Sequence, residues 1–119
     1  MLRALALALL AASAQAGTPT DVVHWWVSPG EIAAKQALAE AYRGGGGEWR
    51  ELAVTASEQA RAIVLGRIAA GNPPMAAQFN PTSVLVRLAR EGRLNAIDDV
   101  AAQGRWAEVL PAVLLDAVR

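Results

Sequence analysis

Apolar residues follow two alternating patterns along residues 22–91. Short apolar runs at residues 22–27, 49–54 and 75–79 predict three strands. The first run is rich in β-branched and aromatic residues without clean alternation, which is typical of a strand buried on both faces of a parallel sheet. The segments between and after these runs carry apolar residues at helical spacing. The predicted order is therefore strand, helix, strand, helix, strand, helix.

The helical spacing also predicts which side chains face the core. In the first helix, residues 31–43, the predicted buried side chains are Ala34, Ala37, Leu38, Ala41 and Tyr42. In the second helix, which begins at residue 57 and ends at Gly71, they are Ala60, Ile63, Val64 and Ile68, with Leu65 as a further candidate. In the third, which ends at Gly92, they are Val84, Leu85, Leu88 and Ala89.

Polar and breaking residues predict where the elements begin and end. Residues 28–30 end the first strand, and the glycines at residues 44–47 end the first helix. Residues 94–97 are predicted to be extended, and residues 106–119 follow a helical pattern interrupted by a proline. The predicted helix N-caps are Ser57, Asn80 and either Asp98 or Asp99.

Each connection between the predicted strands is long enough for a right-handed crossover, so the sequence predicts an α/β fold with a mostly parallel sheet. The last helical pattern runs to the final residue of the 119 without a stop signal. This pattern predicts that the fold is incomplete and the chain truncated.

The first residues have the features of a secretory signal peptide. Arg3 supplies a positive charge, an apolar stretch follows, and Ala14 and Ala16 form an A-x-A cleavage site. Residues 1–16 are thus predicted to be a signal peptide, and residues 17–20 a loose leader before the fold. The chain lacks cysteine, which excludes disulfides, thiolate metal sites and cysteine nucleophiles.

Charge and loop composition favour binding of an uncharged ligand. With 11 basic and 11 acidic residues the chain has no net charge, which argues against a nucleic-acid or membrane-surface partner. In a parallel sheet, ligands bind at the edge where the strands end. The loops predicted at that edge contain hydrogen-bonding side chains but no nucleophile beside a base, and nothing in them indicates a metal site or a cofactor.

Trp25 and Trp26 stand at the end of the first predicted strand, where neighbouring side chains point to opposite faces. One indole is therefore expected in the core and the other at the ligand edge. An indole face suits the C–H face of a sugar ring, and Glu31, Gln78 and Asn80 are suited to hold sugar hydroxyls. The alternative is that both tryptophans are core residues packed against helices.

Two other signals favour structural roles. His24 lies inside the first predicted strand without the partners that a base or metal site requires, so we expect a buried imidazole with its hydrogen bonds satisfied. Asp98 and Asp99 are adjacent carboxylates at a predicted helix start, where such residues usually cap the helix rather than hold a metal.

The segments "HWWVSPGE", "ELAVTASEQARAIVLGRIAAGNPPMAAQF" and "LAREGRLNAIDDVAAQGRWAEVLP" resemble the amino-terminal part of the extracellular sugar-binding proteins of bacterial ABC transporters, in particular the glucose-type subgroup. The resemblance implies that Trp26 stacks on the sugar, that Glu31 accepts hydrogen bonds from its hydroxyls and that Gln78 contacts it. Asn80 would be a weaker fourth contact, and Trp25 mainly a core residue. The loop "VTASEQA" departs from the glycine-rich stretch often found there.

This resemblance implies a type II-like periplasmic-binding-protein lobe, with residues 17–119 forming the amino-terminal part of the first of two lobes. The second lobe would lie in sequence that is absent. The implied protein is a periplasmic, monomeric and non-catalytic binder of a neutral, glucose-like monosaccharide. Its partners would be the sugar and the membrane permease subunits of an ABC importer.

Two alternatives come from other functional classes. The first is a small exported α/β hydrolase that uses Glu31 as its general acid or base, with Asp98 or Asp99 as the second carboxylate. The second is a non-catalytic interaction domain whose tryptophans meet a protein partner.

Overall fold

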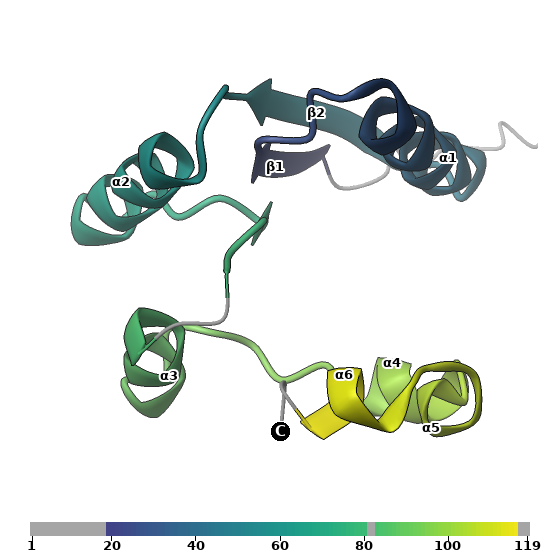
Figure 1. Ribbon diagram of the computed structural model, residues 1–119. Coiled ribbons are helices and arrows are strands. Elements are labelled where there is room, and N and C mark those ends of the chain that lie inside the picture. The colour runs from purple at the N-terminus through teal and green to yellow at the C-terminus, as the bar shows by residue number, and fades with distance from the viewer. Residues whose placement is uncertain (1–18, 81–82, 117–119) are drawn as a thin grey trace, which may run out of the picture. The chain divides into compact units, whose positions relative to one another are not determined.

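The computed structural model describes residues 19–80 and 83–116 (Figure 1). The contacts divide the chain into two compact units, with the boundary between Gln78 and Phe79. The first unit contains β1 (Pro19–His24), α1 (Pro29–Gly44), β2 (Glu48–Ala53), α2 (Ser57–Ala69) and β3 (Ala76–Ala77). The second unit contains α3 (Ser83–Arg90), α4 (Asp98–Gln103), α5 (Trp106–Val109) and α6 (Ala112–Asp116).

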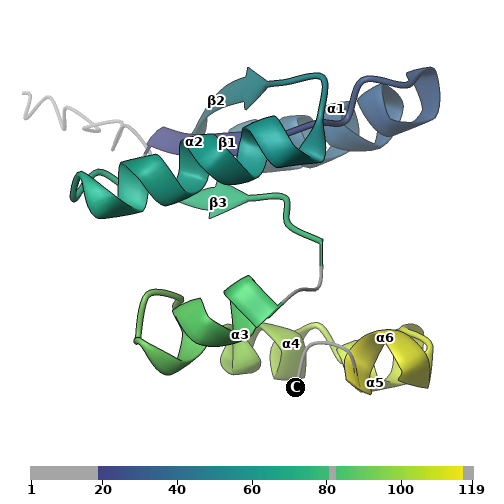
Figure 2. The same cartoon turned by 60° about the vertical axis from the view of Figure 1, so that its left-hand side comes forward.

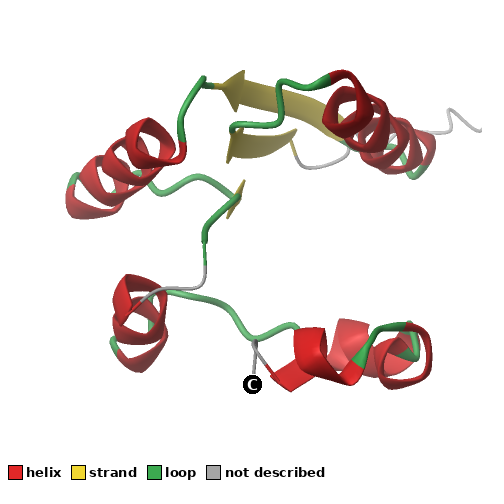
Figure 3. Cartoon of the chain, viewed as in Figure 1, coloured by secondary structure: helices red, strands yellow, loops and turns green. Residues whose placement is uncertain are grey.

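The three strands form one sheet in the order β2-β1-β3, and both pairings are parallel. In the register, Val22 of β1 pairs with Glu51 of β2 on one side and with Ala76 of β3 on the other. Figure 3 shows how strands and helices alternate in this unit. The predicted α/β fold with a parallel sheet is therefore confirmed.

The two helices of the first unit cover opposite faces of this sheet. On one face, Lys35 of α1 donates a hydrogen bond of 2.6 Å to Glu51 of β2. On the other face, Arg67 of α2 pairs with Asp21 of β1. Figures 1 and 2 show the strands between the two helices. Both connections between the parallel strands are expected to be right-handed crossovers. The connection from β1 to β2 and the connection from β2 to β3 run in opposite directions across the sheet, so their helices lie on opposite faces.

The core lies on both faces of β1, as its apolar run predicts. Val23 is fully buried, and Val22, Thr20 and His24 are buried beside it. From α2, Ala60 and Val64 are buried, and the other predicted positions Ile63, Leu65 and Ile68 are partly buried. The predicted buried stripe of α2 is thus confirmed at its centre.

The predicted buried face of α1 is wrong. Ala34, Ala37, Leu38 and Ala41 are exposed, Tyr42 is only partly buried, and the buried residue of the helix is Ala39. The helix is turned so that Lys35 reaches Glu51 and Tyr42 packs edge-on against Trp49, with ring centroids 6.2 Å apart. Because alanines occur all around this helix, its apolar spacing does not single out one face.

The ends of β1 also differ from the prediction. Pro19 and Thr20, predicted to be part of a loose leader, pair with Glu48 and Trp49 of β2. At its other end β1 stops at His24 rather than at residue 27, so both tryptophans of the pair follow the strand. The predicted signal peptide, residues 1–16, lies outside the described residues.

Several predicted helix starts and extended segments are wrong by a few residues. The N-cap of α2 is Ala56 and that of α4 is Ile97, so Ser57, Asp98 and Asp99 occupy the first helical turns. There the negative carboxylates of Asp98 and Asp99 interact favourably with the positive end of the helix dipole, although neither residue is the N-cap. Residues 94–97 do not form a strand, and β3 is limited to Ala76–Ala77. The predicted helix start at Asn80 and Pro81 falls partly outside the described residues.

The second unit consists of short helices with little burial. Leu88 of α3 is buried, Val84 and Leu85 are partly buried, and Ala89, predicted to be buried, is exposed. Helices α4, α5 and α6 bury none of their described residues. Pro111 separates α5 from α6, as predicted. Among the described residues, no helix has the length and apolar character to cross a membrane.

Gly47 allows a close contact that a larger residue would prevent. A Cβ atom at Gly47 would overlap the ring of Tyr42, which contacts Trp49. We expect Gly47→Ala to lower the free energy of unfolding by about 1 to 3 kcal/mol, because the tyrosine ring must leave its position. Urea unfolding followed by tryptophan fluorescence measures this change.

Gly44→Ala is the matched control, because a Cβ atom there meets no other atom within 4 Å. At this helical position alanine should raise stability slightly, by up to about 1 kcal/mol. Equal stability of the two variants would contradict the packing of Tyr42 against Gly47.

Candidate functional site

The candidate site lies where the strand order of the sheet reverses. The chain leaves β1 toward β2 through α1, whereas α2 carries it back past β1 to β3. In open parallel sheets, the loops on either side of such a reversal diverge and leave a crevice at the carboxyl ends of the strands. Here those loops begin with Trp25 after β1 and with Gln78 after β3.

Gln78 joins these two loops. Its backbone N–H donates to the carbonyl oxygen of Val23 at 2.8 Å, which continues the parallel ladder one residue beyond β3. Its side-chain Oε1 accepts the backbone N–H of Trp25 at 3.0 Å. Because that partner is a donor, the amide oxygen must face it, and the NH₂ group of Gln78 points elsewhere. Gln78 is partly buried, and its NH₂ donors take no part in this hydrogen bond.

Trp26 is held by the residue that ends β1. Its backbone N–H donates to Nδ1 of His24 at 3.2 Å, and the two rings stack with centroids 5.5 Å apart and planes 28° apart. Both Trp25 and Trp26 are partly exposed. Trp25, which the resemblance places mainly in the core, is therefore not a fully buried residue. The two indoles keep surface with which to contact a ligand.

Glu31 takes part in capping the N-terminus of α1. Its Oε2 accepts hydrogen bonds from the Ser28 hydroxyl at 2.6 Å and from the Ser28 backbone N–H at 3.0 Å, which forms part of a capping box. The hydrogen bond from the Ser28 side chain, followed by that from its backbone, lowers the pKa of Glu31 below its ordinary value. The carboxylate is thus ionised at neutral pH and has a structural task.

Asn80, the remaining predicted site residue, is exposed and belongs to the second unit. The first unit therefore brings Trp25 and Gln78 into contact, with Trp26 next to Trp25 and Glu31 in the first turn of the following helix α1. The contact of Asn80 with a ligand stays a prediction.

The burial of His24 was predicted correctly, but its hydrogen bonding was not. The side chain is buried, with 1% of its surface exposed, as expected. The expectation that all its hydrogen bonds are satisfied is wrong, because Nε2 has no hydrogen-bond partner and lies 3.7 Å from Oε2 of Glu51. This proximity depends on the register of β1 against β2, which the sequence pattern does not specify.

Glu51 accepts hydrogen bonds of 2.6 Å from Lys35 Nζ and from Trp49 Nε1. Burial raises the pKa of Glu51, but these two hydrogen bonds and the charge of Lys35 together lower it below its ordinary value. An ionised carboxylate therefore faces the unpartnered nitrogen of His24.

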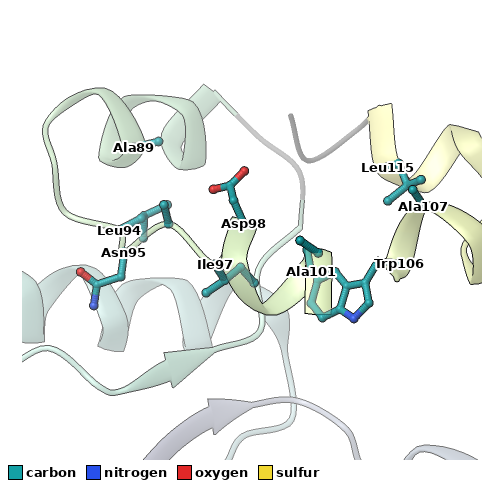
Figure 4. Close-up of a pocket in the computed structure, with 11 residues that line it drawn as sticks. Ala89, Leu94, Asn95, Ile97, Asp98, Ala101, Trp106, Ala107 and Leu115 are labelled. Atoms are coloured by element: carbon teal, nitrogen blue, oxygen red, sulfur yellow. The ribbon is translucent and has the colours of Figure 1, made fainter. Parts of the chain in front are cut away.

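A separate concavity of about 610 Å³ lies within the second unit (Figure 4). Its lining is mainly apolar and also includes the polar side chains of Asn95 and Asp98. None of the predicted sugar-binding residues lines it. The main apolar contributors are Leu94, Ile97, Ala101, Trp106 and Leu115. Within the described residues no cluster of carboxylate, histidine or cysteine side chains is arranged to hold a metal ion.

Comparison with known proteins gives relatives of one kind. The chain is 37% identical over 111 residues to a probable sugar-binding periplasmic protein of Rhizobium meliloti, covering 92% of the chain and 27% of that protein. It is 34% identical over 105 residues to a protein of the same name from Brucella suis, covering 87% of the chain and 25% of the relative. The chain is similar to part of a periplasmic sugar-binding protein. No family model matches it.

This similarity confirms the predicted resemblance to extracellular sugar-binding proteins. The predicted periplasmic location is confirmed as well, since each of these relatives is named a periplasmic protein. Their names describe binding rather than catalysis. The chain spans about a quarter of the length of these relatives.

The capping role of Glu31 predicts a pH dependence of α1. A carboxylate with a lowered pKa in the folded state contributes stability above its ordinary pKa, and this contribution is lost as the pH falls through the lowered value. We expect the first turn of α1 to become less protected in acid, with hydrogen exchange of its amides as the measurement.

In Glu31→Gln this acid-dependent loss should disappear, because the side chain no longer titrates. Glu40→Gln, which removes an exposed carboxylate from the same helix, should leave the loss unchanged. If Glu31→Gln retained the acid response of the parent chain, the Ser28–Glu31 cap would not be its cause.

Proposed function

We propose that the chain is part of a periplasmic protein that binds a neutral, glucose-like monosaccharide and delivers it to an ABC importer. The observation that supports this most is the hydrogen bond between Gln78 and Trp25 at the strand-order reversal. It places a partly exposed tryptophan pair beside a polar amide where ligands bind in such sheets. The names of the relatives supply the ligand class.

The chemistry of these groups suits a neutral sugar. Trp26 offers an indole face to the C–H groups of the ring, and Gln78 offers amide donors to its hydroxyls. Glu31 and Asn80 add acceptors in this proposal. The absence of net charge across the whole sequence agrees with an uncharged ligand.

In this proposal residues 17–119 are the amino-terminal part of the first lobe, after a signal peptide at residues 1–16. The exposed apolar side chains of the second unit, such as Val109 at 69% and Val113 at 72%, would pack on further parts of that lobe. A second lobe would close over the sugar and exclude water from its hydrogen bonds. The closed monomer would then dock on the membrane permease subunits.

The hydrogen bonds that Glu31 accepts from Ser28 argue against the hydrolase alternative. A general acid needs a raised pKa so that it carries a proton at neutral pH. The Ser28 hydrogen bonds act in the opposite direction. The relatives' names point the same way, because they describe binding.

The test uses a chimera in which the aligned segment of the Rhizobium meliloti protein is replaced by this chain. In that chimera Trp26→Ala should weaken sugar binding by about 1 to 3 kcal/mol, because the apolar sugar face loses its stacking surface. Isothermal titration calorimetry with glucose, galactose, mannose and xylose measures the affinity.

Trp26→Phe keeps an aromatic plate and should retain most of the affinity. Trp49→Phe changes a tryptophan of β2 that packs on Tyr42 and should have little effect on the sugar. Unchanged affinity in Trp26→Ala would disprove the stacking role. A folded chimera that binds none of the sugars, beside a parent protein that binds one, would disprove the proposed ligand class for this chain.

A further inference from the structure

His24 connects the core of the sheet to the tryptophan loop. Its backbone oxygen accepts the N–H of Val54 at 2.9 Å, so the residue is fixed at the end of the parallel ladder. Its imidazole is almost fully buried and touches Trp26 twice, through the hydrogen bond to Nδ1 and through ring stacking. A shift of this ring therefore acts directly on the residue proposed to stack on the sugar.

The hydrogen bond to Trp26 determines where the proton of the neutral imidazole lies. Because the N–H of Trp26 donates, Nδ1 of His24 must present a lone pair. The proton of the neutral ring is then on Nε2, which has no hydrogen-bond partner and lies 3.7 Å from Glu51 Oε2. In this neutral form Nδ1 of the ring accepts the hydrogen bond from Trp26, whereas Nε2 forms no hydrogen bond with the carboxylate of Glu51.

The charged groups near the ring lie on four elements, β2 and α1 on one face of the sheet and β1 and α2 on the other. On the face of the sheet that His24 shares with α1, the neighbouring charged groups are Glu51 of β2 and Lys35, which is bound to Glu51. On the opposite face, Asp21 of β1 is paired with Arg67 of α2. The paired segment of β3 contains only alanines. Glu51 is thus the charged group nearest the imidazole.

We propose that His24 is a positioning residue that holds Trp26 at the sheet edge while its imidazole is neutral and releases it when the ring is protonated. A second proton must go to Nδ1, so that two donors then face each other where a hydrogen bond existed. The resulting positive ring is attracted to Glu51 on its other side. Acid therefore removes the hydrogen bond that orients the loop.

A positive ring still attracts the face of an indole, so ring stacking alone does not report the release. The backbone amide of Trp26 is the direct reporter of the lost hydrogen bond.

The first experiment needs no sugar and uses the 119-residue chain itself. Nuclear magnetic resonance follows the Trp26 amide and the His24 ring protons from about pH 8 to about pH 5. We expect both signals to change with the same midpoint. A Trp26 amide that stays constant while His24 titrates, a His24 that does not titrate in this range, or a chain unfolded at neutral pH would each overturn the proposal.

Two variants separate positioning from a merely structural role. In His24→Asn, the side-chain oxygen can accept the N–H two residues later, as asparagine does in Asx turns, but it does not titrate. The Trp26 amide should then keep its hydrogen-bonded shift throughout the pH range. In Glu51→Gln, which keeps the buried ring, the common midpoint should move to lower pH because the protonated ring loses its attraction. An unmoved midpoint would contradict the part assigned to Glu51.

The consequence for the sugar rests on the proposed function and is tested separately in the chimera. If the neutral ring defines the binding-competent state, affinity should fall about tenfold per pH unit below the midpoint. In His24→Asn affinity should depend less on pH. A chimera that binds no sugar would count against the proposed function, while the amide titration of the chain would still decide the role of His24.

Discussion

The hydrogen bonds on both sides of β1 determine where the candidate binding residues lie. At the carboxyl end of the strand, Val54 donates to the carbonyl of His24 and Gln78 donates to the carbonyl of Val23. The end of β1 is therefore fixed by β2 on one side and by the continuation of β3 on the other. The tryptophan pair begins at the next residue, so its position relative to Gln78 follows from strand pairing. A loop attached to an edge strand would be fixed on one side only.

The loop that carries the tryptophans is held mainly by side chains that accept its backbone N–H groups. Trp25 donates to Gln78 after β3, Trp26 donates to His24 of β1, and Ser28 donates to Glu31 of α1. Side chains from three separate parts of the first unit thus each accept one donor of a four-residue segment. This arrangement orients the indoles without burying them, which limits the conformational entropy lost when a ligand binds.

The sequence predicts the element order and the parallel sheet because periodicity and crossover length restrict both. It also predicts that Trp26 and Gln78 share an edge, since both follow strands of one parallel sheet. The buried face of α1 is not predictable in this way, because alanines surround the helix and its contact from Lys35 to Glu51 is long-range. The contact between His24 and Glu51 depends on strand register, and the capping task of Glu31 depends on local geometry. Neither can be read from residue type alone.

These internal hydrogen bonds change what the loop can offer to a ligand. Gln78 uses its oxygen for Trp25, and Glu31 uses Oε2 for Ser28, so part of the polar capacity expected for a sugar already serves the fold. What stays available on this side is mainly indole surface and the amide donors of Gln78. A site built on these loops therefore contributes more stacking than hydrogen bonding. In the proposed function, discrimination among neutral sugars, which differ in the directions of their hydroxyls, would then require further polar groups.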